Sequence, residues 1–573
     1  MNYIISILLA LLPYIACSQI DSTRLITDGY FISPVDHTMK LAGSFGELRS
    51  NHFHSGIDIK SKKGAEGDTI RCAADGYISR IKLQRGSYGK VVYIDHPNGF
   101  TTVYAHMQRF SPEIESYIRE RQKAVESYEV ELFPSADKFQ LEQGQPIGHL
   151  GNTGRSYGPH LHFEIRNTVT EIPQNPYLHG IGPEDEKNPL LYAVSVQGMD
   201  RDLIEVSDET KYINLTKGNK EMYGPIHKFE VPAWRAAVSI QAFDLMDGAA
   251  NKNGLYHLKM YVDDTLHYEM KMDSVGWDET KYINSFIEYE EKKVNTRTLI
   301  RCYKQKNNPL SLYRTIRNNG FFKVFKNKAR KIRFEAIDFY GNRSISKCEV
   351  LRREQVPSDV RNTTFSKKIK YNQAYDFKLG VTHMSIPKGI TDNTLLLEHS
   401  QGKNAEGELA LRLGHSYQPL FDYMSLTLPL SSVPPDLRSK AVLVYISSKT
   451  PTSFGGTVIG DSLAVKVNKL GKFLLTTDET PPTITPLEYK KDASLRKDFK
   501  FRLKDNFNTR GAAKDITYDV YIDGVWTICP LKALGDLLTI PLEGIPSGDH
   551  FLQITATDHS GNSTNWKGSF FTK

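Results

Sequence analysis

Short runs of alternating hydrophobic and polar residues recur along most of this chain. In one run, His160, His162 and Glu164 alternate with three apolar residues. Successive side chains of a strand point to opposite faces, so the polar residues share one face and the apolar residues enter a core. Residues 76–81 and 90–95 are similarly rich in β-branched and aromatic residues and are bounded by glycine-containing turns. The pattern predicts a mainly β protein with antiparallel strands.

One segment of the same region has helical spacing instead. Residues 112–125 follow Ser111, which suits a helix N-cap, and begin with Pro112, which suits the first helical position. We therefore expect a helical insertion at about 112–140, which either packs on the sheet or forms a wall of a substrate groove. Its predicted apolar stripe consists of Ile114, Tyr117, Ile118 and Val125.

Later in the chain, two segments repeat one pattern. Residues 336–342 and 556–562 both read A-x-D-x-x-G-N, and each follows an earlier matching pair of β-rich runs. The pattern resembles the last strands of bacterial immunoglobulin-like domains, which implies β-sandwich folds. The predicted later domains are a β-sandwich at 195–352 with an insertion around 272–325, a β-rich domain at 353–479 that ends at a Thr-Pro-Pro linker, and a second immunoglobulin-like β-sandwich at 480–573.

The first residues of the chain predict export. Residues 4–12 form an apolar run, and Ala16-Cys17-Ser18 fits a small-x-small cleavage site before Gln19. We expect a signal peptide at 1–18, with lipidation of Cys17 as the alternative. Later runs do not reach the roughly 20 apolar residues of a transmembrane span. The mature protein is therefore expected in the periplasm or cell envelope, either associated with the outer membrane or secreted.

Composition limits the function classes only modestly. The 573 residues are 39% hydrophobic and 24% charged, as in soluble globular proteins. The net charge of +7 favours anionic polymers without identifying one, and the chain carries no nucleic-acid-binding motif. The cysteines form no C-x-x-C pattern, which argues against a cysteine zinc site. A disulfide between Cys302 and Cys348 and a pair of unpaired buried thiols both fit the sequence.

The candidate chemistry lies in the first third of the chain. His54 and Asp58 are four residues apart and share a face if the segment is extended. Catalytic zinc takes three protein ligands and keeps one open position, and two imidazoles with one carboxylate are a suitable set. One histidine of the His160/His162 pair completes that set, and the other is free to act on a substrate. His106, at the end of a predicted strand, is a further candidate.

These motifs together resemble the lysostaphin/LytM-type zinc endopeptidases over roughly residues 28–180. The family pattern H-x-x-x-D, Y-x-H and G-x-T-G-x-S-x-G-P-H-L-H-F-E appears in order and complete, and Tyr157 stands where the family usually has a small residue. The resemblance implies an N-terminal antiparallel β peptidase domain that binds Zn²⁺. It also implies the site residues, which are His54, Asp58 and His162 as metal ligands and His106 and His160 as catalytic histidines.

The implied function is that of an exported zinc metalloendopeptidase that cuts peptide stems or cross-links of peptidoglycan. The chain has no H-E-x-x-H motif, so a histidine must transfer the proton. We expect His160 to be the base and His106 the oxyanion stabiliser, although the two roles are exchangeable. Glu164 fits either support of a ligand or an ordinary strand position, and His52 lies on the face of His54. The alternatives are a non-catalytic scaffold that docks on the wall or activates a partner hydrolase, and a peptidase for glycine-rich protein.

Overall fold

The computed structural model describes residues 26–27, 29–199, 211–353, 365–446, 450–532 and 534–573. The predicted signal peptide, its cleavage site and Cys17 lie outside these residues. Within the described part of the chain, no helix is long and apolar enough to cross a membrane. The protein is mainly β, as predicted, and its sheets define four units, at residues 29–189, 190–353, 365–479 and 480–573.

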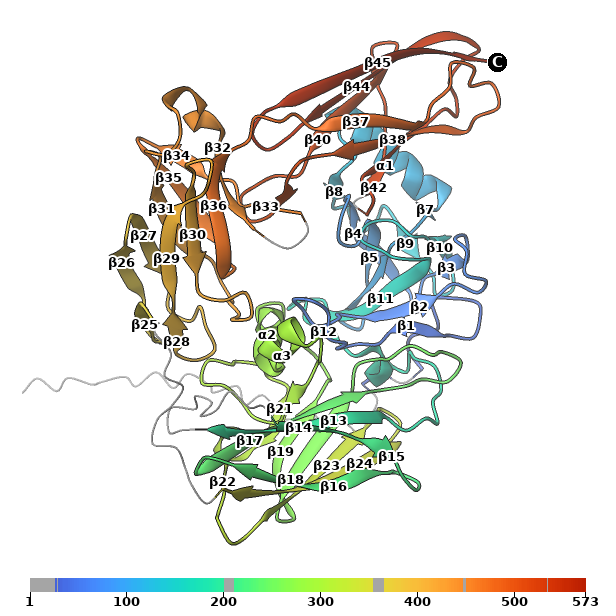
Figure 1. Cartoon of the computed structure of the whole chain (residues 1–573). Coiled ribbons are helices and arrows are strands. Elements are labelled where there is room, and N and C mark those ends of the chain that lie inside the picture. Colours follow the sequence, from blue (N-terminus) through green and yellow to red (C-terminus); the bar gives the residue numbers. More distant parts are fainter. Residues whose placement is uncertain (1–25, 28, 200–210, 354–364, 447–449, 533) are drawn as a thin grey trace, which may run out of the picture.

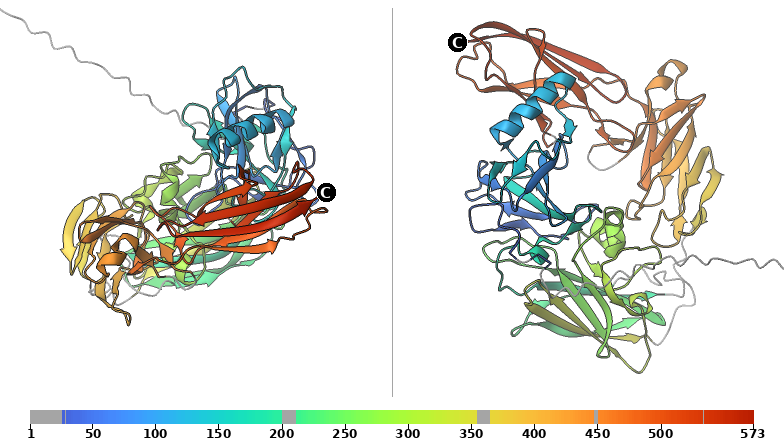
Figure 2. Two further views of the ribbon diagram at one scale, coloured as in Figure 1. Left: turned by 90° about the horizontal axis from the view of Figure 1, so that it is seen from above. Right: turned by 180° about the vertical axis from the view of Figure 1, so that it is seen from behind.

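The four units follow one another around a ring. Figure 1 and the view from behind in Figure 2 show the fourth unit ending beside the first. There, the Arg85 guanidinium donates a hydrogen bond to the Ile516 carbonyl and lies 6.0 Å from the Tyr518 ring centroid. The ring is thus closed by side chains of the first and last units.

The first unit contains the antiparallel sheet that the alternation predicts. Leu161, Phe163 and Ile165 are fully buried in its core, while His160, His162 and Glu164 lie on the opposite face. The main path of the sheet is β1 (Leu41–Gly43), β2 (Ile57–Lys60), β11 (His160–Asn167), β6 (Phe100–Ala105), β5 (Lys90–Asp95), β4 (Gly76–Leu83) and β8 (Val130–Leu132). Strands β12 (Pro173–Gln174) and β9 (Gln140–Leu141) pair with β11 and β4, and a second sheet joins β3 (Thr69–Arg71), β10 (Pro146–His149) and β7 (Arg109–Phe110).

The predicted helix is present as α1 (Pro112–Val125). Pro112 opens it and Ser111 has an extended backbone before it, although the Ser111 side chain makes no capping hydrogen bond. Ile114, Ile118 and Gln122 form the buried face, so the placement of Val125, which is 62% exposed, in the apolar stripe is wrong. The helix ends when Glu126 adopts left-handed backbone angles. Both figures place α1 next to the fourth unit.

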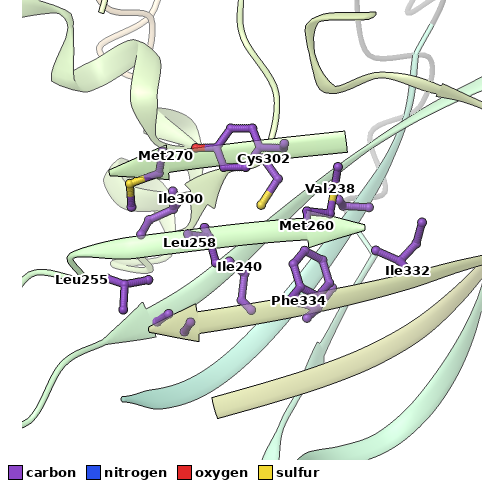
Figure 3. Packing of buried hydrophobic residues seen from close by; sticks show 14 of the residues in the cluster. Val238, Ile240, Leu255, Leu258, Met260, Met270, Ile300, Cys302, Ile332 and Phe334 are labelled. Carbon is purple, nitrogen blue, oxygen red and sulfur yellow. The ribbon is translucent and has the colours of Figure 1, made fainter. Parts of the chain in front are cut away.

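The second unit is a sandwich of two sheets. Leu258 and Met260 of one sheet pack with Phe334, while Val238 and Ile240 of the other sheet close the core (Figure 3). The first sheet contains β14 (Lys211–Asn214), β13 (Leu190–Met199), β17 (Arg235–Phe243), β20 (Ile300–Arg301) and β22 (Phe322–Lys323). The second contains β15 (Thr216–Lys217), β16 (Met222–Val231), β24 (Arg343–Arg352), β23 (Arg330–Ile337), β18 (His257–Val262), β19 (Thr265–Lys271) and β21 (Tyr313–Ile316), with β16 and β24 parallel.

The third unit is also built of two main sheets. Its buried aliphatic and aromatic residues form one core cluster. One sheet is β26 (Tyr375–Leu379), β27 (Thr382–Ile386), β31 (Met424–Pro429), β35 (Ser462–Val467) and β34 (Thr457–Ile459). The other is β29 (His399–Lys403), β30 (Leu409–Leu413), β36 (Gly471–Thr477), β32 (Ala441–Tyr445) and β33 (Thr452–Ser453), and β25 (Lys367–Ile369) pairs with β28 (Leu395–Leu397).

The fourth unit repeats the two-sheet arrangement around a separate core. Its β39 (Asn508–Thr509) pairs in parallel with β33, which joins it to the third unit. The remaining strands are β37 (Thr483–Glu488), β38 (Asp498–Lys504), β43 (Leu537–Pro541) and β42 (Leu531–Lys532) in one sheet, and β41 (Val525–Trp526), β40 (Thr517–Ile522), β44 (Gly548–Thr557) and β45 (Ser563–Thr572) in the other. The immunoglobulin-like assignment of the second and fourth units stays a prediction.

A helical segment of the second unit contacts both neighbouring units. It contains η2 (Thr280–Tyr282), α2 (Ile283–Phe286) and α3 (Tyr289–Val294), near the centre of the ring in Figure 1. The Phe286 ring centroid lies 5.5 Å from that of Phe53 in the first unit, and the Tyr282 centroid lies 4.6 Å from that of Phe421 in the third. Phe53 adjoins His54 in the chain, so this segment supports the loop that carries a predicted ligand. The short helices η1 (Pro176–His179), η3 (Arg317–Gly320) and η4 (Pro435–Lys440) lie elsewhere.

The cysteines of the described residues are all buried free thiols, so the Cys302–Cys348 disulfide is not formed and the unpaired alternative holds. Burial raises the pKa of the Cys72 and Cys348 thiols to about 12. Buried neutral thiols behave as small apolar core residues.

Candidate active site

Three neighbouring strands bring the predicted site residues together. Strands β2 and β11 pair so that Asp58 lies opposite His162, and β11 pairs with β6 so that His162 also lies opposite Ala105. His106 directly follows Ala105, and His160 opens β11. Residues that are about a hundred positions apart in the chain therefore meet because of strand register.

The three predicted metal ligands form one compact donor set. His54 Nε2 lies 2.9 Å from Asp58 Oδ1, His162 Nδ1 lies 2.9 Å from the same oxygen, and the two imidazole nitrogens are 3.0 Å apart. All three side chains are buried. Two nitrogens and a carboxylate oxygen are ligand types that zinc prefers.

Hydrogen bonds on the far side of each ring orient the imidazoles. The Nδ1 of His54 lies 2.7 Å from the carbonyl oxygen of Ser44, which can only accept, so this nitrogen carries the proton. The Nε2 of His162 lies 2.7 Å from Glu164 Oε1, which favours a proton there. In neutral rings the two nitrogens that face each other would then both present lone pairs, and lone pairs 3.0 Å apart repel. A cation between them removes this conflict, so the donor set fits a zinc ion.

Two arginines hold the carboxylates of the site. Arg49 donates to Asp58 Oδ2 at 2.7 Å, which leaves Oδ1 facing the histidines. Arg166 donates to Glu164 Oε2 at 2.5 Å. Burial opposes ionisation of both carboxyls, but the histidines around Asp58 and the Arg166 charge beside Glu164 keep both pKa values below their usual range. Both groups are therefore carboxylates at neutral pH.

The charges of Asp58 and Glu164 make the electrostatic environment of the donor set negative. Burial lowers the pKa of His54. Burial acts the same way on His162, yet hydrogen bonds to Asp58 and Glu164 raise the pKa of that imidazole to about 9. Without a metal ion the cluster therefore retains a proton at His162. The same negative charge favours a divalent cation in its place.

The two remaining histidines lie beside the donor set and share one hydrogen-bonding arrangement. His106 Nδ1 lies 2.8 Å from the Thr153 carbonyl oxygen, and His160 Nδ1 lies 2.8 Å from the Gly158 carbonyl oxygen. Their ring centroids are 4.7 Å apart, and His160 Nε2 lies 3.5 Å from Asp58 Oδ1. Each ring therefore carries its Nδ1 proton toward the backbone and leaves Nε2 free for chemistry.

Backbone geometry around His106 is unusual. Its φ is +60°, in the left-handed region that residues other than glycine rarely adopt. The glycine-rich turn supports this position, because Thr153 of that turn accepts its ring proton. Gly154 is required there, since a Cβ at this glycine would lie 2.3 Å from the Gly89 nitrogen. Burial, followed by the charges of His160 and His162, lowers the pKa of His106 to about 3.

Several supporting residues were not predicted from the sequence. The Tyr88 hydroxyl and the Ser55 hydroxyl donate to Glu164 Oε1 at 2.6 and 2.7 Å. Ser44, Arg49 and Arg166 were also missed. Arg166 had a detectable signal, because it continues the alternation His160, His162, Glu164 on one face of β11. The other four lie in loops or turns, where no periodic pattern marks them.

Two residues near the site take no part in the donor set. His52 is exposed, and its Nδ1 lies 2.8 Å from Asn51 Oδ1. Tyr157 stands where the family usually has a small residue. Its side chain is 91% exposed, so this difference leaves the donor set unchanged. Glu164, by contrast, is fully buried and contacts His162, which fits support of a ligand.

Family comparisons agree with the predicted resemblance. Residues 52–126 and 135–176 match peptidase family M23, and residues 366–478 match a Zu5-like domain. The first unit therefore carries an M23 peptidase domain, as the sequence motifs predicted. The Zu5-like domain falls within the predicted β-rich region, where sequence patterns indicated no family.

Two curated relatives each match about a quarter of this chain. The DD-carboxypeptidase/endopeptidase Mpg of Neisseria meningitidis is 34% identical over 148 residues, which are 26% of this chain and 25% of that protein. The peptidoglycan DD-endopeptidase ShyC of Vibrio cholerae is 31% identical over 158 residues, 27% of this chain and 30% of that protein. The chain thus spans between a quarter and a third of the length of these relatives.

Solved structures match over a similar share of the chain. The M23 catalytic domain of EnpA from Enterococcus faecalis is 20% identical, with a TM-score of 0.20 over 27% of this chain and 100% of that domain. The lysostaphin catalytic domain from Staphylococcus simulans is 20% identical, with a TM-score of 0.18 over 24% of this chain and 92% of that domain.

Proposed function

We propose that this protein is an exported zinc metalloendopeptidase that hydrolyses peptide stems or cross-links of peptidoglycan. The observation that carries the proposal is the buried donor set of His54 Nε2, Asp58 Oδ1 and His162 Nδ1, with two further imidazoles beside it. The relative ShyC, which is named a peptidoglycan DD-endopeptidase, supports the substrate class. The complete set of five site residues favours catalysis over a scaffold role, because docking on the wall needs no arrangement of this kind.

In this mechanism His54, Asp58 and His162 hold the zinc ion. When bound, zinc polarises the scissile carbonyl and lowers the pKa of water toward about 7. His160 accepts a proton from the attacking water at Nε2 and passes it to the leaving amine nitrogen when the C–N bond breaks. Its Nδ1–H···O=C bond to Gly158 stabilises the imidazolium in between. Glu164 and Ser44 hold the two ligand rings in place.

His106 is assigned the role of stabilising the oxyanion that develops on the substrate. Because the Thr153 carbonyl accepts the Nδ1 proton, His106 donates to substrate only after it takes up a second proton, from solvent, at Nε2. Burial disfavours that charged form in the free protein, and the negative charge that develops on the substrate oxygen supplies the partner that favours it. His106 therefore stabilises the transition state more than the ground state.

Digestion of purified sacculi tests this function directly. The zinc-loaded protein should release soluble peptides whose masses identify the bond that is cut. A chelator should abolish release, and added zinc should restore it. Full activity after verified metal removal would contradict the zinc mechanism. If the fully zinc-loaded protein left the sacculi undigested, the result would favour the scaffold role. Cleavage of glycine-rich protein but not of sacculi would favour a peptidase for glycine-rich protein.

Contacts from the second unit should influence zinc binding and catalysis through the loop that precedes His54. Thr280 Oγ1 accepts the Phe53 backbone N–H at 2.9 Å, and Lys292 donates to the Arg49 carbonyl at 3.3 Å. Thr280→Val leaves that N–H without its partner, which costs about 1 kcal/mol or more. Because His54 is the next residue, we expect several-fold weaker zinc binding and lower kcat/KM, with unchanged products.

Competition with a chromophoric zinc chelator measures this effect. Thr315→Val is the matched control, since Thr315 donates to Glu269 within the second unit, away from the loop. It should leave zinc affinity unchanged. Equal zinc affinity in Thr280→Val and the native protein would show that the second unit does not influence the ligand loop.

A further inference from the structure

A second group of potential ligands lies where the first unit meets the second. Asp185, Asp244 and Asp338 each place one carboxylate oxygen within 4.8 Å of the others, and all three are buried. Among the described residues, no lysine or arginine forms an ion pair with any of them. Burial, followed by the neighbouring carboxylates, raises the pKa of Asp244. Three buried carboxylates this close need a proton or a cation to neutralise them.

One buried carboxylate oxygen of this cluster has no hydrogen-bond partner among the residues that the structure describes. Asp185 is 7% exposed, and its Oδ1 accepts the backbone N–H groups of Lys187 and Asp247, both at 3.1 Å. Its Oδ2 is buried without a hydrogen bond within the described chain. The three carboxylates and Ser44 line a small cavity of about 10 Å³. That volume holds about one water-sized particle.

The chain contains a closely matching cluster that serves as an internal comparison. Asp478, Asp505 and Asp558 also meet within 4.8 Å, at the entry to the fourth unit. Asn342 donates to the Asp185 carbonyl oxygen at 3.0 Å, and Asn562 donates to the Asp478 carbonyl oxygen at 2.9 Å. Each asparagine is the last residue of the repeated A-x-D-x-x-G-N pattern, so the two junctions have the same construction.

The two clusters differ in how the first aspartate is satisfied. In the later cluster, Asn506 donates to Asp478 Oδ1 at 3.1 Å and Ser560 donates to Oδ2 at 3.0 Å. The equivalent positions in the earlier cluster are Leu245 and Tyr340. The leucine side chain offers no donor, and the Tyr340 hydroxyl donates to the Pro183 carbonyl at 2.5 Å. Among the described residues, the first aspartate of the earlier cluster therefore has no counterpart of these two side-chain donors and accepts from backbone N–H groups instead.

We propose that Asp185, Asp244 and Asp338 bind one Ca²⁺ ion at the junction of the first two units. All the candidate ligands are oxygens, which suits a hard cation and disfavours zinc. Mg²⁺ is less suitable, because it usually binds through one or two carboxylates and keeps several waters.

Calcium at this position would link the second unit to the zinc-ligand loop. Ser44 lines the cavity, its Oγ accepts the Gly254 N–H at 3.0 Å, and its carbonyl oxygen accepts the His54 ring proton at 2.7 Å. The ion would thus stabilise the junction that orients His54. This proposal does not depend on the proposed hydrolysis, since its measurements are binding and stability.

Calcium binding and thermal unfolding of the full zinc-loaded chain test the proposal. The protein is first freed of calcium on a chelating resin, with its zinc content verified, and CaCl₂ is then added. We expect bound calcium by mass spectrometry of the metals and a rise in Tm of roughly 5 °C at a hundredfold excess over Kd. MgCl₂ at the same concentration should give a smaller rise.

Asp185→Asn should abolish this calcium response. Removing one of three repelling charges should leave the calcium-free variant at least as stable as the calcium-free native protein, which separates loss of a ligand from misfolding. Asp478→Asn is the matched control and should retain the response from the earlier junction. An unchanged calcium response in Asp185→Asn, or no bound calcium and no Tm shift in the native protein, would overturn the proposal.

Discussion

Replacing His162 with alanine should leave a folded protein that holds almost no zinc and shows no measurable hydrolysis. His162 supplies Nδ1 to a donor set of three, within 2.9 Å of Asp58 Oδ1. Loss of a residue that merely supports a ligand typically lowers metal affinity by about 10- to 100-fold, so loss of the ligand itself should cost more. His54→Ala and Asp58→Ala should behave in the same way. Zinc per chain, measured by atomic absorption after gel filtration, is the readout.

His52→Ala is the matched control for these ligand variants. His52 is a histidine two residues before His54, but it is exposed and bonded to Asn51. Its removal should leave both zinc content and hydrolysis at native levels. Circular dichroism should show native strand content in every variant. If all three ligand variants kept full zinc, the metal site would have to lie elsewhere in the protein.

The polar face of β11 shows which site residues can be predicted from the sequence. Alternation alone predicts that His160, His162 and Glu164 share one face, and extending the pattern by two residues includes Arg166. These four side chains share a face because of the geometry of a single strand. By contrast, Arg49 and Tyr88 reach the site from a loop and a turn. Their roles depend on which strands become neighbours, and local sequence carries little information about that.

The surroundings of the site were less predictable than its ligands. The helix α1 was predicted from spacing, but its position beside the fourth unit depends on closure of the ring. The contact of Phe286 with Phe53 joins residues more than two hundred positions apart. Likewise, the repeated pattern predicted two similar domains, while the clustering of Asp185 with Asp338 arises only when the junction is folded. Long-range contacts of this kind leave no periodic signal in the sequence.

Alanine at His106 or His160 should separate catalysis from metal binding. Neither ring belongs to the donor set, although His160 Nε2 lies 3.5 Å from Asp58 Oδ1. Zinc content should therefore stay near one per chain, while kcat falls by roughly 100-fold or more, as for loss of a general base or an oxyanion donor. Zinc loss in His160→Ala with retention in His162→Ala would reverse the assignment within the pair.

Glutamine variants should assign the two catalytic roles. A glutamine amide can donate a hydrogen bond to an oxyanion but cannot accept a proton as a base at neutral pH. Under the proposed assignment, His106→Gln should recover part of the activity lost in His106→Ala, whereas His160→Gln should recover none. The pH profile of kcat/KM gives a second readout, because loss of the base should remove the decline on the acid side. Recovery in His160→Gln alone, with the acid limb lost in His106→Ala, would exchange the roles. Either assignment of the two roles fits the structure, because a backbone carbonyl accepts the Nδ1 proton of each ring.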